Sequence, residues 1–587
     1  MANFKYDLGD EKDQGFPIYL AVSLIVLLGG LFAVVWAVDA TLPFALTIED
    51  EAQKADRFIA GRAQDHLKGL TDIGPRVVGS VENEILTVDY LKSRIEEILN
   101  ECKNPGVDID HQIQSGAFYL DYRPYGSINA YSNLQNLVVR LPGEDDTKES
   151  ILINSHFDTM PNSPGGSDDG IMCAVMLELL RHMCNEQSKS NLIFLFNGAE
   201  ESYLQGSHAF IANENKWNDR IKLVINLEAT GAGGKEMLFQ AGPQQYWLLD
   251  HYSQVPHPHA QVAGEEIFES NLIPSDTDFR IFRDFGNTIG YDMAYTRNGY
   301  RYHSENDGFE NIDVGTFQHT GDNVLALVRA LSKVSVISKQ DPNRKPIFYD
   351  MFGLFLVYYE ENVEVAVNIV AILLSLASAI LGFYRAQLKF SAKSGKCLII
   401  NLLGTIVGWL LALAFVLGIG AILDAVNKTM SWYRFPFFVA GLYVIPVFLA
   451  LSLTTMLLLK YNSYENLNGD VLIIIHINRL IWTVILLAGT ALSIRSSYIL
   501  IFPIYFTSIA LVIINVFKLE VQRKTWQIVY VISTVIPTMF SMYIALEVYG
   551  LFVPICGRSG SESNPEFIIG LFTWIIGSFI LSFYASY

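Results

Sequence analysis

Eight long apolar segments constrain the fold of this 587-residue chain more strongly than any other feature of its sequence. The first covers residues 16–38, which is long enough to cross the ~30 Å hydrocarbon core of a bilayer as a helix. A polar stretch of about 300 residues follows it, and we expect one water-soluble domain over residues 42–345. The other seven segments form a multi-span region over 362–587, at 362–384, 397–423, 437–459, 471–493, 496–517, 527–549 and 566–586.

The first apolar segment is expected to be an uncleaved anchor. The apolar core of a signal peptide spans about 7–15 residues, and this segment is longer. Val38-Asp39-Ala40 is a loose match to a cleavage site, so a cleaved leader is the alternative. At the other terminus the sequence stops directly after an apolar segment, which suggests that the sequence is truncated or that a further domain is missing from it.

Basic residues in the loops predict on which side of the membrane the soluble domain lies. They follow the second and the sixth apolar segments, at 385–396 and 518–524. By the positive-inside rule these loops and an N-terminal tail of residues 1–15 face the cytosol, which places the soluble domain on the lumenal or extracellular side. The same topology places the sequon at Asn427 outside, so Asn427 is a candidate glycosylation site.

Charge and cysteine content narrow the function further. The net charge is −19 and no stripe of clustered Lys and Arg is present, so no nucleic-acid partner is expected. Cys173 and Cys184 lie eleven residues apart on one predicted helix, about 16 Å, which is too far for a disulfide. Cys102 can pair with either of them. The polar residues inside the apolar segments, among them Arg479 and Glu547, are expected to serve packing near span ends rather than transport.

The soluble stretch alternates helical and strand-like patterns. Residues 48–70 and 81–100 show the spacing of amphipathic helices. Apolar runs predict strands at 136–140, 150–154, 191–196 and 223–227. Helical stretches near 170–184 and 204–215 separate the last three of these strands. This alternation predicts an α/β domain with a mixed, largely parallel sheet flanked by helices.

Metal-binding side chains follow the ends of three predicted strands. His156 comes after one strand, Glu200 and Glu201 after the next, and Glu228 after a third. Because ligands bind outside the carboxyl ends of parallel strands, we expect these side chains to meet at one edge of the sheet. Taken singly, each has an ordinary explanation, such as a surface histidine or a solvated start of a helix.

Two further positions complete the candidate site. Asp168 and Asp169 follow a Pro-Gly-Gly turn, where an aspartate could also cap the next helix. His303 lies far downstream among polar and aromatic residues. Two imidazoles and several carboxylates in this order are the ligands that a pair of zinc ions around one water molecule requires.

These residues resemble a known family. The sequence is similar to the co-catalytic zinc exopeptidases typified by secreted bacterial aminopeptidases, and more narrowly to the membrane-anchored endoplasmic reticulum metallopeptidases. The resemblance covers roughly residues 45–340 and rests on His156-Phe-Asp158, Gly166-Ser-Asp168-Asp169, Asn197-Gly-Ala-Glu200-Glu201, Asn226-Leu-Glu228, Tyr302-His303, Ser275-Asp-Thr-Asp-Phe-Arg280 and Asp284-Phe-Gly286.

The resemblance implies two zinc ions bridged by Asp168. Glu201 and His303 would complete one site, and His156 and Glu228 the other. Many relatives carry aspartate where Glu228 stands, which puts the occupancy of the second site in doubt. The resemblance also implies that Glu200 is the general base, that Asp158 orients His156, and that the substrate pocket includes Asp276, Asp278 and Tyr302.

The predicted function is therefore that of a membrane-anchored zinc exopeptidase, an aminopeptidase by resemblance, with peptide substrates and with membrane lipid around its spans. The resemblance also implies the endoplasmic reticulum membrane. The alternatives are a glutaminyl-cyclase-like aminoacyltransferase with one zinc ion, a non-catalytic chaperone or assembly module that keeps the fold, and a transporter with a peptidase-like ectodomain.

Overall fold

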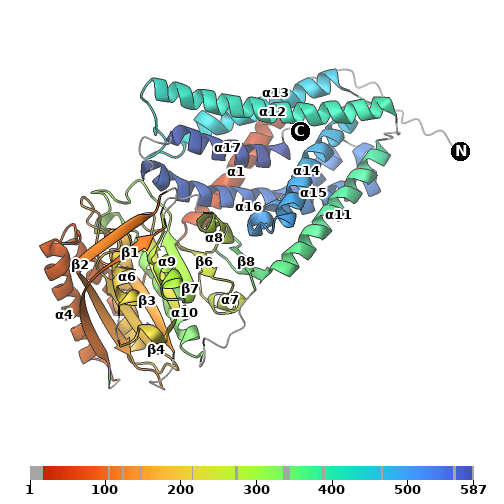
Figure 1. The fold of residues 1–587 in the computed structure, drawn as a ribbon. Helices are drawn as coiled ribbons and strands as arrows, with labels where there is room; N and C mark the ends of the chain where they lie inside the picture. Colours follow the sequence, from red (N-terminus) through yellow and green to blue (C-terminus); the bar gives the residue numbers. More distant parts are fainter. Residues whose placement is uncertain are drawn as a thin grey trace.

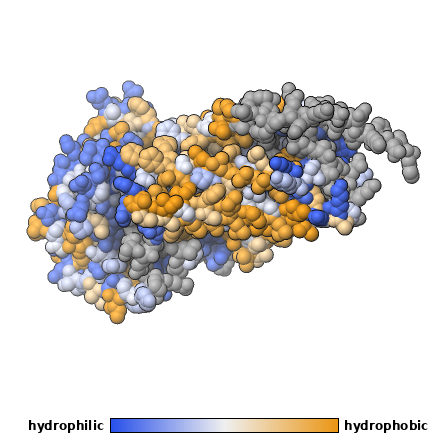
Figure 2. All heavy atoms as spheres, turned by 90° about the horizontal axis from the view of Figure 1, so that it is seen from above, coloured by the Kyte–Doolittle hydropathy of each residue, from blue (hydrophilic) through white to orange (hydrophobic). Residues whose placement is uncertain are grey.

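The computed structural model describes residues 18–584 apart from gaps at 104–105, 122–124, 145–148, 214–215, 271–274, 335–336, 338–343, 387–390, 464–466, 522 and 559–563. The predicted tail of residues 1–15 lies outside the described residues. In Figure 1 a sheet-containing domain stands at one end of a group of long helices. Figure 2 shows hydrophobic side chains gathered over those helices and hydrophilic ones over the sheet-containing domain.

A seven-stranded mixed sheet forms the centre of the soluble domain, which confirms the predicted fold class. β4, β3, β5 and β7 run parallel in the middle, where buried apolar runs on both faces favour parallel pairing. Antiparallel partners cover both edges, β1 and β2 on one side and β6 on the other. In spatial order the strands are β1 (Asp108–Leu120), β2 (Ser127–Leu141), β4 (Asn191–Asn197), β3 (Ser150–His156), β5 (Ile221–Ala229), β7 (Ile289–Tyr295) and β6 (Glu236–Gly242).

Helices pack against both faces of this sheet. The larger core joins one face to α3 (Ala60–Thr71), α4 (Val88–Asn100), α5 (Ile171–Met183), α7 (Tyr246–Tyr252) and α10 (Val314–Leu331). The opposite face carries α6 (Gln205–Ala212), α8 (Val262–Glu269) and α9 (Asp278–Asp284). A disulfide joins Cys102, after α4, to Cys184, after α5, and this settles the pairing that the sequence left open.

The predicted helix over 48–70 is wrong in its continuity. A short turn at Ile48–Asp50 leads into α2 (Glu51–Lys54), and α3 begins only at Ala60. Phe58 and Ile59, between the two helices, are fully buried, and Ile59 has an extended backbone. The side chain of Gln318 on α10 donates to the Phe58 carbonyl (2.9 Å), so tertiary packing interrupts the helical periodicity here.

Eight helices in the described part of the chain are long and apolar enough to cross a membrane, one for each predicted span. A two-stranded sheet, β8 (Pro346–Asp350) and β9 (Leu356–Glu360), connects the soluble domain to them. The eight apolar helices are α1 (Ile18–Ala40), α11 (Glu361–Arg385), α12 (Ala392–Ala425), α13 (Ile445–Tyr461), α14 (Leu467–Ala491), α15 (Tyr498–Val516), α16 (Arg523–Arg558) and α17 (Pro565–Ser582).

One buried polar residue of these helices, Arg479, joins neighbouring helices and does not lie at a span end. Arg479 is fully buried, and its guanidinium donates to the hydroxyls of Ser375 (3.1 Å) and Ser378 (3.0 Å) on α11. Hydrogen bonding of this kind satisfies a polar group that water does not reach, so Arg479 joins two helices instead of extending toward the membrane surface.

Several polar contacts hold the soluble domain against the membrane helices. Arg495, in the short turn just before α15, donates to Glu265 and Glu269 of α8, both at 2.8 Å. The hydroxyl of Tyr543 on α16 donates to Asp350 of β8 (2.7 Å). The soluble domain is therefore packed directly on the membrane part.

Candidate metal centre

The five predicted metal ligands lie at the carboxyl-terminal edge of the parallel strands. His156 is the last residue of β3, and Glu228 is the last but one of β5. Glu201 lies in the turn after β4, and Asp168 lies in the turn Gly166–Gly170 that leads into α5. His303 belongs to the loop after β7. Convergence at this edge was the central prediction from the sequence.

Asp168 stands between two groups of candidate ligands. The Nε2 atom of His156 lies 3.2 Å from Oδ1 of Asp168 and 3.4 Å from Oε2 of Glu228. The Nε2 atom of His303 lies 2.7 Å from the other Asp168 oxygen and 3.0 Å from Oε1 of Glu201. In each group the ligand atoms lie within 4.8 Å of one another. One carboxylate thus faces two adjacent imidazoles.

Asp158 organises the surroundings of His156. Its two carboxylate oxygens accept hydrogen bonds from the backbone N–H groups of Glu200 (2.9 Å) and Glu201 (3.0 Å). Its Oδ1 also lies 3.3 Å from Nδ1 of His156, so Nε2 of that ring is directed at Asp168 and Glu228. Metal-bound histidines have this kind of partner on the second ring nitrogen.

Two supporting residues were not identified from the sequence. Asp307 accepts from the backbone N–H groups of Ser167 (2.9 Å) and Asp168 (3.2 Å), and thereby positions the central carboxylate. Arg76 is fully buried and donates to the carbonyls of Phe157 and Pro164, both at 2.7 Å. The only sequence signals are an acid four residues after His303 and a cation directly after Gly74-Pro75.

The site concentrates negative charge in a buried place. Burial and the neighbouring Asp168 raise the pKa of Glu201 to about 7. Burial and Glu228 raise the pKa of the Glu200 carboxyl well above its usual range. Although burial lowers it, the neighbouring carboxylates of Asp168 and Glu201 raise the pKa of His303 to about 9. The carboxylates therefore hold protons, or another positive charge, more readily than free carboxylates do.

The donor set fits zinc. The Nε2 atoms of both histidines, one Asp168 oxygen and Oε1 of Glu201 are buried and have no hydrogen-bond partner. Leaving several buried polar atoms unpaired is costly. A pair of cations among imidazole nitrogens and carboxylate oxygens, the ligands zinc prefers, would pair all of them.

The remaining predicted site residues fall into different places. Tyr302 stacks on His303 with ring centroids 3.7 Å apart. Asp276 pairs with Arg280 (3.1 Å) on α9, and its place in a substrate pocket stays a prediction. Asp278 lies deeper, and its place in a substrate pocket also stays a prediction. Its side chain is 1% exposed, and its Oδ2 accepts from the amides of Asn154 and Asn197, so it supports the strands beneath the site.

Comparison with known proteins places these motifs in a family. The model of peptidase family M28 matches residues 136–328, the stretch that contains all five candidate ligands. Residues 136–328 are therefore similar to the peptidases of family M28. Residues 394–587 match a second family model, the transmembrane domain of endoplasmic reticulum metallopeptidase 1. The M28 domain and the membrane helices are thus recognised separately.

Curated relatives match across both parts. Endoplasmic reticulum metallopeptidase 1 of Mus musculus is 35% identical over 547 residues, which are 90% of this chain and 60% of that protein. Putative endoplasmic reticulum metallopeptidase 1-A of Caenorhabditis elegans is 41% identical over 349 residues, 58% of this chain and 39% of that protein. The chain thus spans at most about 60% of these two relatives. The solved aminopeptidase of Aneurinibacillus sp. strain AM-1 covers 50% of this chain and 100% of its own, with 15% identity and a TM-score of 0.39.

Proposed function

We propose that this chain is a membrane-anchored zinc-dependent aminopeptidase that hydrolyses peptides on the lumenal side of the endoplasmic reticulum membrane. The observation that supports it most is the pair of His–carboxylate groups sharing Asp168 within an M28 domain. The names of the relatives and the basic residues of the loops support the membrane and the orientation.

When bound, two zinc ions would lower the pKa of a water molecule toward ~7 and polarise the peptide carbonyl. His156 and Glu228 would hold one ion, His303 and Glu201 the other, and Asp168 both. Glu200 accepts the proton of the attacking water and returns it to the leaving amine. Burial and Glu228 raise the pKa of Glu200, which makes its carboxylate a better proton acceptor.

The test is Glu200→Gln in the purified full chain. We expect the variant to keep its zinc content, because Glu200 is not a ligand, and to lose hydrolysis of aminoacyl-coumarin amides by at least about a hundredfold. Metal content is measured by mass spectrometry and activity by fluorescence. Full activity in the variant would contradict the assignment of the base. One zinc ion per chain together with cyclisation of glutaminyl peptides would instead favour the transferase.

A further inference from the structure

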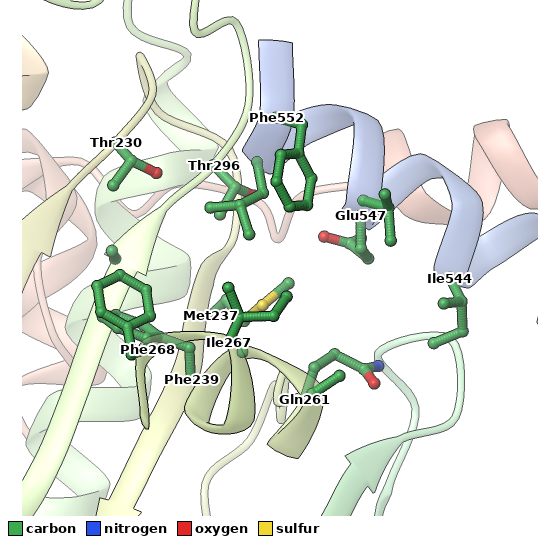
Figure 3. A pocket seen from close by; sticks show the side chains of 15 residues that line it. Thr230, Met237, Phe239, Gln261, Ile267, Phe268, Thr296, Ile544, Glu547 and Phe552 are labelled. Carbon is green, nitrogen blue, oxygen red and sulfur yellow. The ribbon is translucent and has the colours of Figure 1, made fainter. Parts of the chain in front are cut away.

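A second feature of the M28 domain lies where it meets the membrane helices. A cavity, in which about 60 Å³ is open to the centres of water molecules, lies between β6, β7 and α8 on one side and α16 on the other. Figure 3 shows Phe239 and Phe268 on the wall from the soluble domain, facing Ile544, Glu547 and Phe552 of α16. We call this cavity the α16 pocket.

The α16 pocket lies on the same face of the sheet as the side chain of Glu228. Glu228 of β5 pairs in register with Ala294 of β7, and Ala294 pairs with Met237 of β6. Ala294 and Met237 both line the pocket. Residues paired across neighbouring strands project to the same face and lie about 4.8 Å apart, so the pocket begins one strand away from a metal ligand.

The pocket also shares the catalytic edge of the sheet. Thr230 and Thr296 line it, and each comes one residue after the end of its strand, β5 at Ala229 and β7 at Tyr295. A peptide advances by at most about 3.6 Å per residue. The side chain of a substrate residue next to a peptide bond that is held at Asp168 and Glu228 can therefore reach the pocket.

The opposite wall comes from a membrane helix. Ile544, Val548, Leu551 and Phe552 recur at the spacing of one helical face. All four belong to α16, whose candidate membrane span is Thr525–Val553. The membrane part thus closes a pocket that the soluble domain by itself leaves open on this side.

The one carboxylate in the α16 pocket already has a partner. Oε1 of Glu547 lies 3.3 Å from Nε2 of His259, and Nδ1 of His259 contacts the carbonyl of Glu236 (3.2 Å). Asp39 lies close to both and pairs with Arg297. Because these charges are balanced within the protein, the apolar walls decide what the pocket accepts.

We infer that the α16 pocket holds the apolar side chain of the substrate residue next to the scissile bond, so that the preferred substrates are peptides with a large apolar terminal residue, presented at the membrane surface. This rests on the proposed peptidase function. It assigns a membrane helix a direct part in substrate selection.

The experiment compares hydrolysis of leucyl- and alanyl-coumarin amides by the zinc-loaded full chain in detergent. Val548→Phe narrows the pocket, and we expect the leucyl-to-alanyl ratio of kcat/KM to fall at least about tenfold while alanyl hydrolysis persists. Ile536→Phe is the matched control, because Ile536 lies on the same helix and is 50% exposed outside the pocket. It should leave the ratio unchanged.

Phe268→Ala, in the soluble domain, is the opposite change and keeps the test decisive if Val548→Phe does not fold. It enlarges the pocket, so the ratio of naphthylalanyl to leucyl hydrolysis should rise. In a Glu200→Gln background, binding of a fluorescent leucine-terminated peptide measured by anisotropy should weaken with Val548→Phe and not with Ile536→Phe.

If the leucyl-to-alanyl ratio of kcat/KM is unchanged in both Val548→Phe and Phe268→Ala while alanyl hydrolysis is intact, this inference is overturned and the proposed function still stands. Absence of all hydrolysis and peptide binding in the wild type overturns the proposed function itself. Phospholipid that co-purifies with the wild type and is lost in Val548→Phe, with no change in substrate ratio, makes the pocket a lipid site and also overturns the inference.

Discussion

Replacing Asp158 by alanine tests how the metal centre is organised. The Asp158 side chain is fully buried, and its two oxygens accept from the backbone N–H groups of Glu200 and Glu201 while one also faces His156. Asp158→Ala therefore removes the common support of two candidate ligands and the candidate base without removing any ligand.

The structure sets the size of the effect. Two buried N–H groups lose their acceptors, each at about 1–3 kcal/mol, so the free energy of unfolding should fall by about 2–6 kcal/mol. Loss of the partner of a metal-bound histidine weakens metal affinity by about 10–100-fold. At free zinc of about 100 times the wild-type Kd, the stabilisation by zinc should drop from about 2.7 kcal/mol to about 0.4 kcal/mol for a hundredfold weaker site.

Zinc competition with a chromophoric chelator measures the affinity, and thermal unfolding with and without zinc measures the linked stability. Asp219→Asn is the control, because Asp219 is exposed and its loss removes one negative charge away from the site. The reasoning is refuted if Asp158→Ala binds zinc as tightly as the wild type, or if zinc raises the Tm of both proteins equally.

Three other expectations follow from the described contacts. Burial raises the pKa of Glu201 from 4.5 to about 7, so Glu201 destabilises the metal-free fold as the pH rises from 4.5 to about 7. The raised pKa of His303 stabilises the fold fully below pH 6.5, and this stabilisation is lost as the pH rises through about 9. The Tm of the metal-free protein should thus fall from pH 5 to pH 9 by calorimetry in buffers spaced by about one pH unit, and a constant Tm contradicts this. The double variant Cys102→Ala/Cys184→Ala opens a loop closed over a sequence separation of 82 and should lower the free energy of unfolding by about 2–4 kcal/mol, which reductant on the wild type should reproduce. Asn427 is exposed in the loop after α12, so endoglycosidase should increase the gel mobility of the wild type and not of Asn427→Gln; equal mobility before and after digestion contradicts the predicted topology.

The metal centre was predictable because its ligands follow strand ends in the sequence. His156, Glu201 and Glu228 each come at or shortly after the end of a buried apolar run, and parallel strands bring such positions to one edge. Asp307 and Arg76 were not predictable in the same way. They act on backbone groups of the turn around Asp168, and that contact exists only after the loops have folded together.

Packing between distant segments explains the other differences. Phe58 and Ile59 fit a helical pattern, but burial and the hydrogen bond from Gln318 hold this segment extended. Asp278 belongs to a motif carried by the family resemblance, yet it lies beneath the strands because two buried asparagines bind its carboxylate. Periodicity and motif order describe what a segment prefers, and long-range contacts of this kind decide where it lies.

The membrane part contributes to the position of His303 itself. His303 belongs to the loop that follows β7, and this loop contacts the membrane part at two earlier positions. Arg297 pairs with Asp39 at the end of α1, and the hydroxyl of Tyr433, between α12 and α13, donates to the carbonyl of Gly299 (3.4 Å). A ligand on a loop needs such support to hold its geometry, because loops are otherwise the most mobile part of a fold. The membrane part therefore supports the loop that carries His303.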